Sequence, residues 1–296
     1  MLRIIISPAK KMNVADDYPV EASAPRFLEM SEALGDYLRG LDYGTLKEIW
    51  KCNDKIAGLN WERLRDMDLQ RRQTPAVFAY EGIQYQSMAP GVLERSALDY
   101  IGEHLYILSG FYGILRAFDG VVPYRLEMQA RLAWERESSV VSSLYDYWGD
   151  RLCRALAECP EMAGSGAAGQ QADGSQITVV NLASKEYSKA VEPWLTPEIR
   201  YITCVFGEIE AGKGTARGSE AEQQAGAGEM QRVKVKATAA KMARGAMVRF
   251  MAENQVSEPE QLKAFDRMGY RYLEHLSDDK TYVFGTEIRR TERCGR

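Results

Sequence analysis

The chain has 296 residues and a formal net charge of −4, and 45% of its residues are hydrophobic. That hydrophobic content excludes a disordered chain, and the slight acidity excludes nucleic-acid binding through overall charge, though not through a local basic groove. The longest apolar runs are far shorter than the roughly 20 residues of a membrane helix, so we expect no membrane association. Met1 leads directly into a strand-like run, and we therefore expect no signal peptide and a cytoplasmic protein.

Cysteine and histidine usage argues against metal and thiol chemistry. The five cysteines are an odd number and form no CxxC pair, which is typical of reduced thiols in a cytosolic core. Only two histidines, His104 and His275, are present, too few for a His-rich zinc site or a catalytic pair. No P-loop occurs, and no GxGxxG motif joins a predicted strand to a predicted helix, so we predict no metal and no cofactor.

The first half of the chain predicts strands separated by helices. Leu2–Ile6 is a short, nearly continuous apolar run, typical of a strand buried on both faces. Apolar residues at three- and four-residue spacing predict a helix over 25–41. A helix over 46–56, a tight turn at Gly58 and a second helix over 61–67 are expected next. They are followed by a strand at Pro75–Tyr80, a helix at Ala89–Ile101 and a strand at Tyr106–Gly110.

The second half predicts the same alternation. The expected helices are Tyr145–Leu156, Lys185–Val191 with Ser184 as N-cap, Ala239–Asn254 and Pro259–Phe265. The expected strands are Ile177–Leu182, Ile199–Phe206, Arg232–Thr238, Tyr270–Glu274 and Thr281–Phe284. Residues 163–176 and 208–229 are rich in Gly, Ala, Gln and Ser, and we expect flexible loop insertions there, the second being a long hairpin loop. The pattern predicts one compact α/β domain spanning 1–296.

Charge is segregated between Met230 and Ala252, where six basic and no acidic residues occur. On the predicted helix, Lys241, Arg244 and Arg249 fall within an arc of about 140°. Such a face can be simply solvated. However, no acidic residue lies three or four positions from Lys241 or Arg244, and this absence favours an anionic partner.

Other cations lie near predicted strand ends and helix starts. Lys10 follows the first strand, Arg116 and Arg125 flank a glycine-rich stretch, and Lys185 begins a helix. Residues beyond the carboxyl ends of strands in α/β sheets line the ligand crevice, where a helix N-terminus adds N–H donors. This arrangement is compatible with phosphate binding.

The predicted turn at Asp54–Asn60 has two interpretations. In a helix–hairpin–helix element, a glycine turn and nearby lysines such as Lys51 and Lys55 contact a nucleic-acid backbone. A plain pair of helices in the core would give the same pattern.

The segment Tyr124–Met128 offers the candidates for proton transfer. Arg125 and Glu127 share one face of an extended chain, which suits either an acid–base pair or an internal salt bridge. Glu127 and Tyr124 are the catalytic candidates. The sequence gives no support for a nucleophile–histidine site at Ser109, Ser184 or the cysteines.

Six ordered blocks of the sequence carry a recognisable pattern. They are ISPAK at Ile6–Lys10, NDKIAGLN at Asn53–Asn60, LSGFYGILRAFDGVVPYRLEM at Leu108–Met128, YDYWGD at Tyr145–Asp150, NLASKEY at Asn181–Tyr187 and KMARGAMVRF at Lys241–Phe250. They span nearly the whole chain apart from the two insertions and the C-terminal tail. Together these blocks resemble the YaaA family of bacterial peroxide-stress proteins.

The resemblance implies a cytosolic protein that limits free iron and peroxide damage, with a family-specific mixed α/β fold. It also implies a positively charged cleft, a helix–hairpin–helix element at Lys51–Trp61 and DNA binding. The basic positions of the blocks are Lys10, Lys55, Arg116, Arg125, Lys185, Lys241, Arg244 and Arg249. Two features depart from the family: Ala117-Phe118 replaces its usual Pro-Leu, and the 208–229 loop is longer than its hairpin.

Two functions are therefore expected as alternatives. The first is DNA binding through a basic cleft in oxidative-stress defence, with no obligatory protein partner. The second is an enzyme acting on a small phosphate-bearing or nucleotide-derived substrate, although no established catalytic motif is present. Direct iron sequestration has little support, because dispersed cysteines and two histidines do not form a ligand set.

Overall fold

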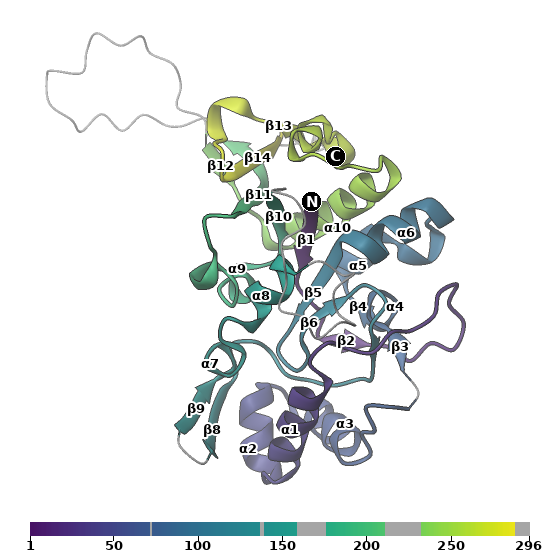
Figure 1. Cartoon of the computed structure of the whole chain (residues 1–296), viewed down its shortest axis with the longest axis vertical. Coiled ribbons are helices and arrows are strands. Elements are labelled where there is room, and N and C mark those ends of the chain that lie inside the picture. The colour runs from purple at the N-terminus through teal and green to yellow at the C-terminus, as the bar shows by residue number, and fades with distance from the viewer. Residues whose placement is uncertain (72, 137–138, 159–175, 211–231, 288–296) are drawn as a thin grey trace, which may run out of the picture.

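A mixed β-sheet forms the centre of the structure (Figure 1). The structure is a computed structural model, and it describes residues 1–71, 73–136, 139–158, 176–210 and 232–287. Eight strands of this described part form the sheet, in the order β13-β14-β11-β10-β1-β5-β6, and β12 pairs with β11. Their bounds are β1 (Leu2–Ile6), β5 (Leu105–Ser109), β6 (Gly113–Arg116), β10 (Ile177–Leu182), β11 (Ile199–Glu210), β12 (Arg232–Lys234), β13 (Arg271–Tyr272) and β14 (Thr281–Thr286).

The five inner strands of the sheet are parallel. β1 lies between β10 and β5, with Leu2 opposite Thr178 and Ile4 opposite Leu105. β11 and β14 continue the parallel set, whereas β6, β12 and β13 are antiparallel additions. All five residues of β1 are buried, which confirms the strand predicted from its apolar run.

Helices cover both faces of this sheet, as the edge-on view in Figure 1 shows. One face carries α5 (Ile83–Met88), α6 (Arg95–His104) and α10 (Ala237–Glu253). The other carries α8 (Arg151–Ala157) and α9 (Lys185–Ser188). The structure thus has the mixed α/β class predicted from the sequence.

The closest helix packing on this side joins α10 to α5. Gly245 makes it possible, because a Cβ atom there would fall on the Gln84 carbonyl oxygen and come within 3.0 Å of the Ser87 Cβ. The missing side chain therefore allows α10 to rest directly on the backbone of α5.

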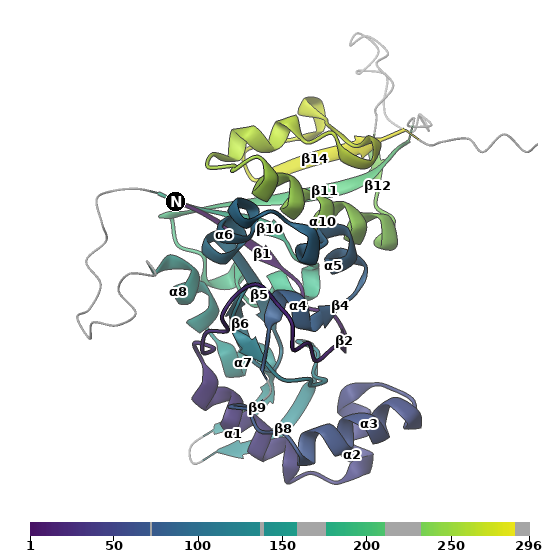
Figure 2. The same ribbon diagram turned by 90° about the vertical axis from the view of Figure 1, so that its right-hand side faces the viewer.

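The remaining elements surround the central sheet, and several lie at the end opposite α10 (Figure 2). The helices are α1 (Leu28–Arg39), α2 (Tyr43–Trp50), α3 (Asp54–Arg65), α4 (Ala76–Ala79) and α7 (Leu144–Trp148). Short 3-10 helices occur at Pro90–Val92, Glu192–Trp194, Pro259–Ala264, Arg267–Gly269 and Glu274–Leu276. Three small strand pairs are β2 (Lys11–Met12) with β4 (Tyr80–Glu81), β3 (Thr74–Pro75) with β7 (Gly120–Val121), and β8 (Arg131–Arg136) with β9 (Ser139–Ser143).

The turn predicted at Asp54–Asn60 is wrong. Gly58 lies inside α3, and the connection between α2 and α3 is Lys51–Asn53. Lys51 adopts a left-handed conformation (φ 45°), and the Asn53 side chain accepts a hydrogen bond from the Ile56 N–H at 3.0 Å. This asparagine cap begins α3 before the glycine is reached, so Gly58 is a helical residue.

Several other predicted boundaries shift. The run 75–80 predicted as a strand is mostly the helix α4, flanked by two-residue strands. The helix predicted over 145–156 is divided into α7 and α8 by Gly149, whose φ is +51°. β11 continues to Glu210, three residues into the predicted loop, and the rest of that loop and most of 163–176 lie outside the described residues.

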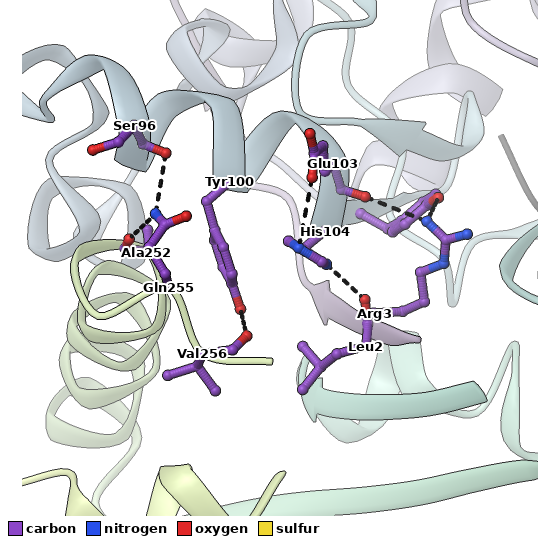
Figure 3. A network of polar contacts seen from close by, with 10 residues as sticks. Leu2, Arg3, Ser96, Tyr100, Glu103, His104, Ala252, Gln255 and Val256 are labelled. Carbon is purple, nitrogen blue, oxygen red and sulfur yellow. Dashed lines mark hydrogen bonds and ion pairs between the residues drawn. The ribbon is translucent and has the colours of Figure 1, made fainter. Parts of the chain in front are cut away.

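A polar network ties β1 to α6 and α6 to the end of α10 (Figure 3). The Arg3 guanidinium is buried and donates to the Glu103 carbonyl oxygen and the Tyr106 hydroxyl, at 3.3 and 2.6 Å. The His104 Nδ1 lies 2.8 Å from the Leu2 carbonyl oxygen, and the Tyr100 hydroxyl donates to the carbonyl oxygen of Val256 at 2.6 Å. One of the two histidines is therefore part of the scaffold.

Candidate functional site

The site begins where the parallel strands end. Ser7 follows β1 and Ser184 follows β10, and the Ser184 N–H donates to the Ser7 Oγ at 2.8 Å. The two hydroxyl oxygens are 3.2 Å apart, and the Ser184 side chain makes no capping bond to α9. From β1 the chain passes to β5 on one side of β1, and it later reaches β10 on the other side of β1. The carboxyl ends of β1 and β10 therefore form a topological switch point, the place where α/β sheets bind ligands. We call this end the carboxyl edge of the sheet.

Glu127 lies at this edge between two of the predicted cations. The Lys10 Nζ is 2.7 Å from Glu127 Oε1, and an Arg125 terminal nitrogen is 3.7 Å from the same oxygen. Lys10 is 66% exposed, whereas the side chains of Arg125 and Glu127 are only 11% and 16% exposed. The Arg125 Nε also donates to the Trp50 carbonyl oxygen at 3.2 Å, which ties this group to the end of α2.

A second carboxylate, Glu186, lies beside this group. Its Oε1 is 3.5 Å from the Gln129 N–H, and its carbonyl oxygen accepts a hydrogen bond from the Tyr145 hydroxyl at 2.8 Å. Burial raises the pKa of Glu186, and the negative charge of Glu127 raises it further, while Lys10 acts in the opposite direction. Glu186 is not among the residues predicted from the sequence, although it directly follows Lys185 in the NLASKEY block.

Tyr124, the other proton-transfer candidate, is enclosed in the core. Its hydroxyl lies 2.8 Å from that of Tyr80 and 2.7 Å from that of Ser109, and Tyr124 is only 7% exposed. Burial raises the pKa of Tyr124 to about 12. The Ser109 Oγ accepts the N–H groups of Phe111 and Tyr112, at 3.2 and 2.9 Å. This hydroxyl chain shapes the turn after β5 and makes Tyr124 part of the scaffold.

Lys51 and Lys55 are exposed at the start of α3. Neither makes an ion pair with any residue that the structure describes, whereas the neighbouring Lys47 pairs with Asp54 at 2.7 Å. The α2–α3 pair is held near Glu127 by the bond from Arg125 to Trp50. Figure 2 shows α3 and α10 on one side of the molecule, with β2 and β4 between them along its long axis.

On α10, the three predicted cations have different surroundings. Lys241 is exposed, Arg244 is half-buried, and neither has a carboxylate partner in the described ranges. The Arg244 Nε is buried without a hydrogen bond, and burial lowers the pKa of this guanidinium. Arg249, by contrast, pairs with Glu253 at 2.7 Å, a carboxylate that Arg267 also approaches at 3.1 Å.

Arg116 lies at the opposite edge of the sheet. β6 is antiparallel to β5, so Arg116 is opposite Tyr106, near the start of β5. It borders a groove of about 940 Å³ between residues 18–23 and α6. The structure therefore brings Lys10, Arg125 and Lys185 to one edge and places Arg116 at the other.

The buried carboxyl group of Asp119 follows Arg116. It accepts hydrogen bonds from the Arg116 N–H and the Ser23 hydroxyl, both at 2.8 Å, and Asp119 is 2% exposed. Burial outweighs these bonds and raises the pKa of Asp119 to about 6. A raised folded-state pKa means that this group favours folding below its unfolded pKa, and that this contribution is lost as pH rises through the folded pKa.

Asp119→Asn is therefore expected to become more stable relative to the wild type as pH rises. Between about pH 4 and about pH 8 the difference in free energy of unfolding should grow by on the order of 3 kcal/mol. Urea unfolding of both proteins at several pH values measures it. Parallel stability curves would contradict the buried position of this carboxyl group.

No group of three or more His, Cys, Asp or Glu side chains is placed to hold a metal ion among the residues that the structure describes. Within the same ranges, no helix combines the length and apolar character needed to cross a membrane.

Comparison with known proteins identifies the family. The family model described as peroxide stress protein YaaA matches residues 2–276. A UPF0246 protein of Desulfitobacterium hafniense is 46% identical over 283 residues, covering 96% of this chain and 97% of that protein. Another, from Agathobacter rectalis, is 45% identical over 287 residues, covering 97% of this chain and all of the relative. The chain therefore belongs to the YaaA family of peroxide stress proteins.

Proposed function

We propose that this protein acts in the cytoplasm in peroxide-stress protection. It limits free iron and oxidative DNA damage by binding DNA through cations at the carboxyl edge of the sheet, on the α2–α3 pair and on α10. Family membership supports the stress role. The observation that carries DNA binding is a set of cations without carboxylate partners among the described residues: Lys51, Lys55, Lys185, Lys241 and Arg244.

Their positions suit a phosphate backbone. Lys185 begins α9 at the carboxyl edge of the sheet, while Lys51 and Lys55 extend the basic surface along the α2–α3 pair. A duplex places phosphates at regular intervals, so it can engage cations spread over several elements. The overall charge of −4 would oppose such binding, so the proposed binding depends on the local grouping of these cations.

The alternative, an enzyme with a small phosphate-bearing substrate, has less support. Glu127 and Glu186 are candidates for a proton-transfer pair, but the sequence carries no established catalytic motif around them. The cations without carboxylate partners are spread over α9, the α2–α3 pair and α10, and this spread suits an extended duplex better than one small ligand. We therefore favour the DNA-binding function.

The test is a titration of labelled duplex DNA at several salt concentrations. If about five phosphates are neutralised, the logarithm of the association constant should fall by about 4 to 5 per tenfold rise in salt. A salt-independent affinity, or no binding at low salt, would reject the proposal.

A further inference from the structure

One acidic side chain occupies the centre of the proposed phosphate-binding edge. Lys10 and Arg125 approach the same oxygen of Glu127, at 2.7 and 3.7 Å. Two cations converging on one oxygen is the arrangement with which proteins hold a phosphate oxygen. The carboxylate of Glu127 thus stands where an oxygen of a bound phosphate would be expected.

The surroundings of Glu127 make this position electrostatically balanced. Glu186 lies nearby, and burial together with the negative charge of Glu127 raises the pKa of Glu186. The charged and titratable groups around the two carboxylates are Lys10 after β1, Arg125 beside Glu127, Tyr187 on α9 and Tyr145 on α7. The pKa of Glu186 is therefore shifted toward neutrality.

We propose that Glu127 is an internal counter-anion of this site, displaced when a phosphate binds, and that the Glu127–Glu186 pair then takes up a proton. The proposal rests on the proposed phosphate-binding function and adds its regulation. The phosphate oxygen replaces the carboxylate oxygen next to Lys10 and Arg125. The proton comes from the solvent and binds to a carboxylate oxygen of the pair, which relieves the repulsion between three negative groups.

Two consequences follow for affinity. Competition from Glu127 lowers phosphate affinity, so removing its charge should raise that affinity. Proton uptake also links binding to pH, so the wild type should bind more tightly as pH falls, by up to tenfold per pH unit for about one proton taken up. Linkage requires the reverse as well: bound phosphate should make the pair easier to protonate.

The variant Glu127→Gln keeps the shape of the side chain and removes its charge. We expect its duplex affinity at about pH 8 to exceed that of the wild type by about tenfold, and its pH dependence to be weaker. The matched control is Glu81→Gln. Glu81 pairs with Lys11 at 2.6 Å, next to the site, so the control changes net charge equally without touching the Lys10–Arg125 pair. Its affinity should rise less than that of Glu127→Gln.

A second test uses only the wild type, so it does not depend on whether the variants fold. Calorimetric titration with duplex DNA in two buffers of different ionisation enthalpy reports the protons taken up, because phosphodiesters do not titrate near neutrality. Uptake approaching one proton at about pH 6 supports the proposal. Equal affinities for both glutamine variants together with no proton uptake would overturn it.

Sulfate, whose charge is constant over this range, separates this failure from failure of the DNA-binding function. If neither the wild type nor either glutamine variant binds duplex DNA, the proposed function is rejected. The counter-anion inference is then decided by thermal stabilisation in sulfate, which should be larger for Glu127→Gln than for Glu81→Gln. Equal stabilisation of the two variants would overturn the inference as well.

Discussion

Replacing Gly245 by alanine is expected to lower the free energy of unfolding by about 3 kcal/mol or more. The added methyl group would overlap the Gln84 carbonyl oxygen, and backbone cannot rotate away as a side chain can. Alanine is intrinsically the better helix former by about 1 kcal/mol, so a net loss can come only from the contact between α10 and α5. Urea unfolding followed by circular dichroism measures this difference.

Gly58→Ala is the matched control, because Gly58 also lies inside a helix but no heavy atom lies within 4 Å of the position of its added Cβ. We expect this variant to be more stable by up to about 1 kcal/mol. A large loss would instead indicate a glycine-dependent turn at Gly58. Wild-type stability of Gly245→Ala would contradict the close approach of α10 to α5.

The double variant Lys185→Glu, Lys241→Glu is expected to lower duplex affinity at low salt by about a hundredfold, or about 1.4 kcal/mol per replaced side chain. Both lysines are exposed and have no acidic partner in the part of the chain that is described, so their removal should leave the fold intact. Losing two phosphate contacts should also reduce the magnitude of the salt slope by about 2.

The control for this experiment reverses two arginines that already have acidic neighbours. Arg95 pairs with Asp99 at 2.9 Å and Arg154 with Asp150 at 3.8 Å. Arg95→Glu, Arg154→Glu changes the net charge by the same amount but lies on α6 and α8, away from the proposed cations. If both double variants lose affinity equally, binding depends on net charge and the proposed surface is wrong.

The inner strands could be predicted from the sequence because burial on both faces leaves a continuous apolar signal. Leu2–Ile6 and Ile177–Leu182 have the bounds that their apolar runs predict. Short elements could not be predicted in this way. PAVFAY, residues 75–80, has the composition of a strand, but its Val77 N–H donates to the Ala117 carbonyl oxygen and its middle forms α4. Only its first and last residues belong to strands, the two-residue β3 and β4. Tertiary contacts decided that segment.

Part of the candidate site was also visible in the sequence. The cations at Lys10, Arg125 and Lys185 could be predicted because they follow or flank strand-like runs whose carboxyl ends share an edge. Arg116 could not be placed, because a sequence pattern does not show that β6 runs antiparallel to β5 and so returns to the other edge. Glu186 was missed because its role depends on Glu127, which is far away in the chain.

The position of β1 has a consequence for synthesis on the ribosome. This first strand pairs with β5 and with β10, whose Thr178 lies opposite Leu2. The emerging polypeptide therefore exposes a largely apolar segment for most of its translation, until its second neighbour leaves the exit tunnel. Long-range parallel pairing also makes spontaneous assembly slow. Nascent chains of this protein should therefore depend on holding chaperones until β10 has been made.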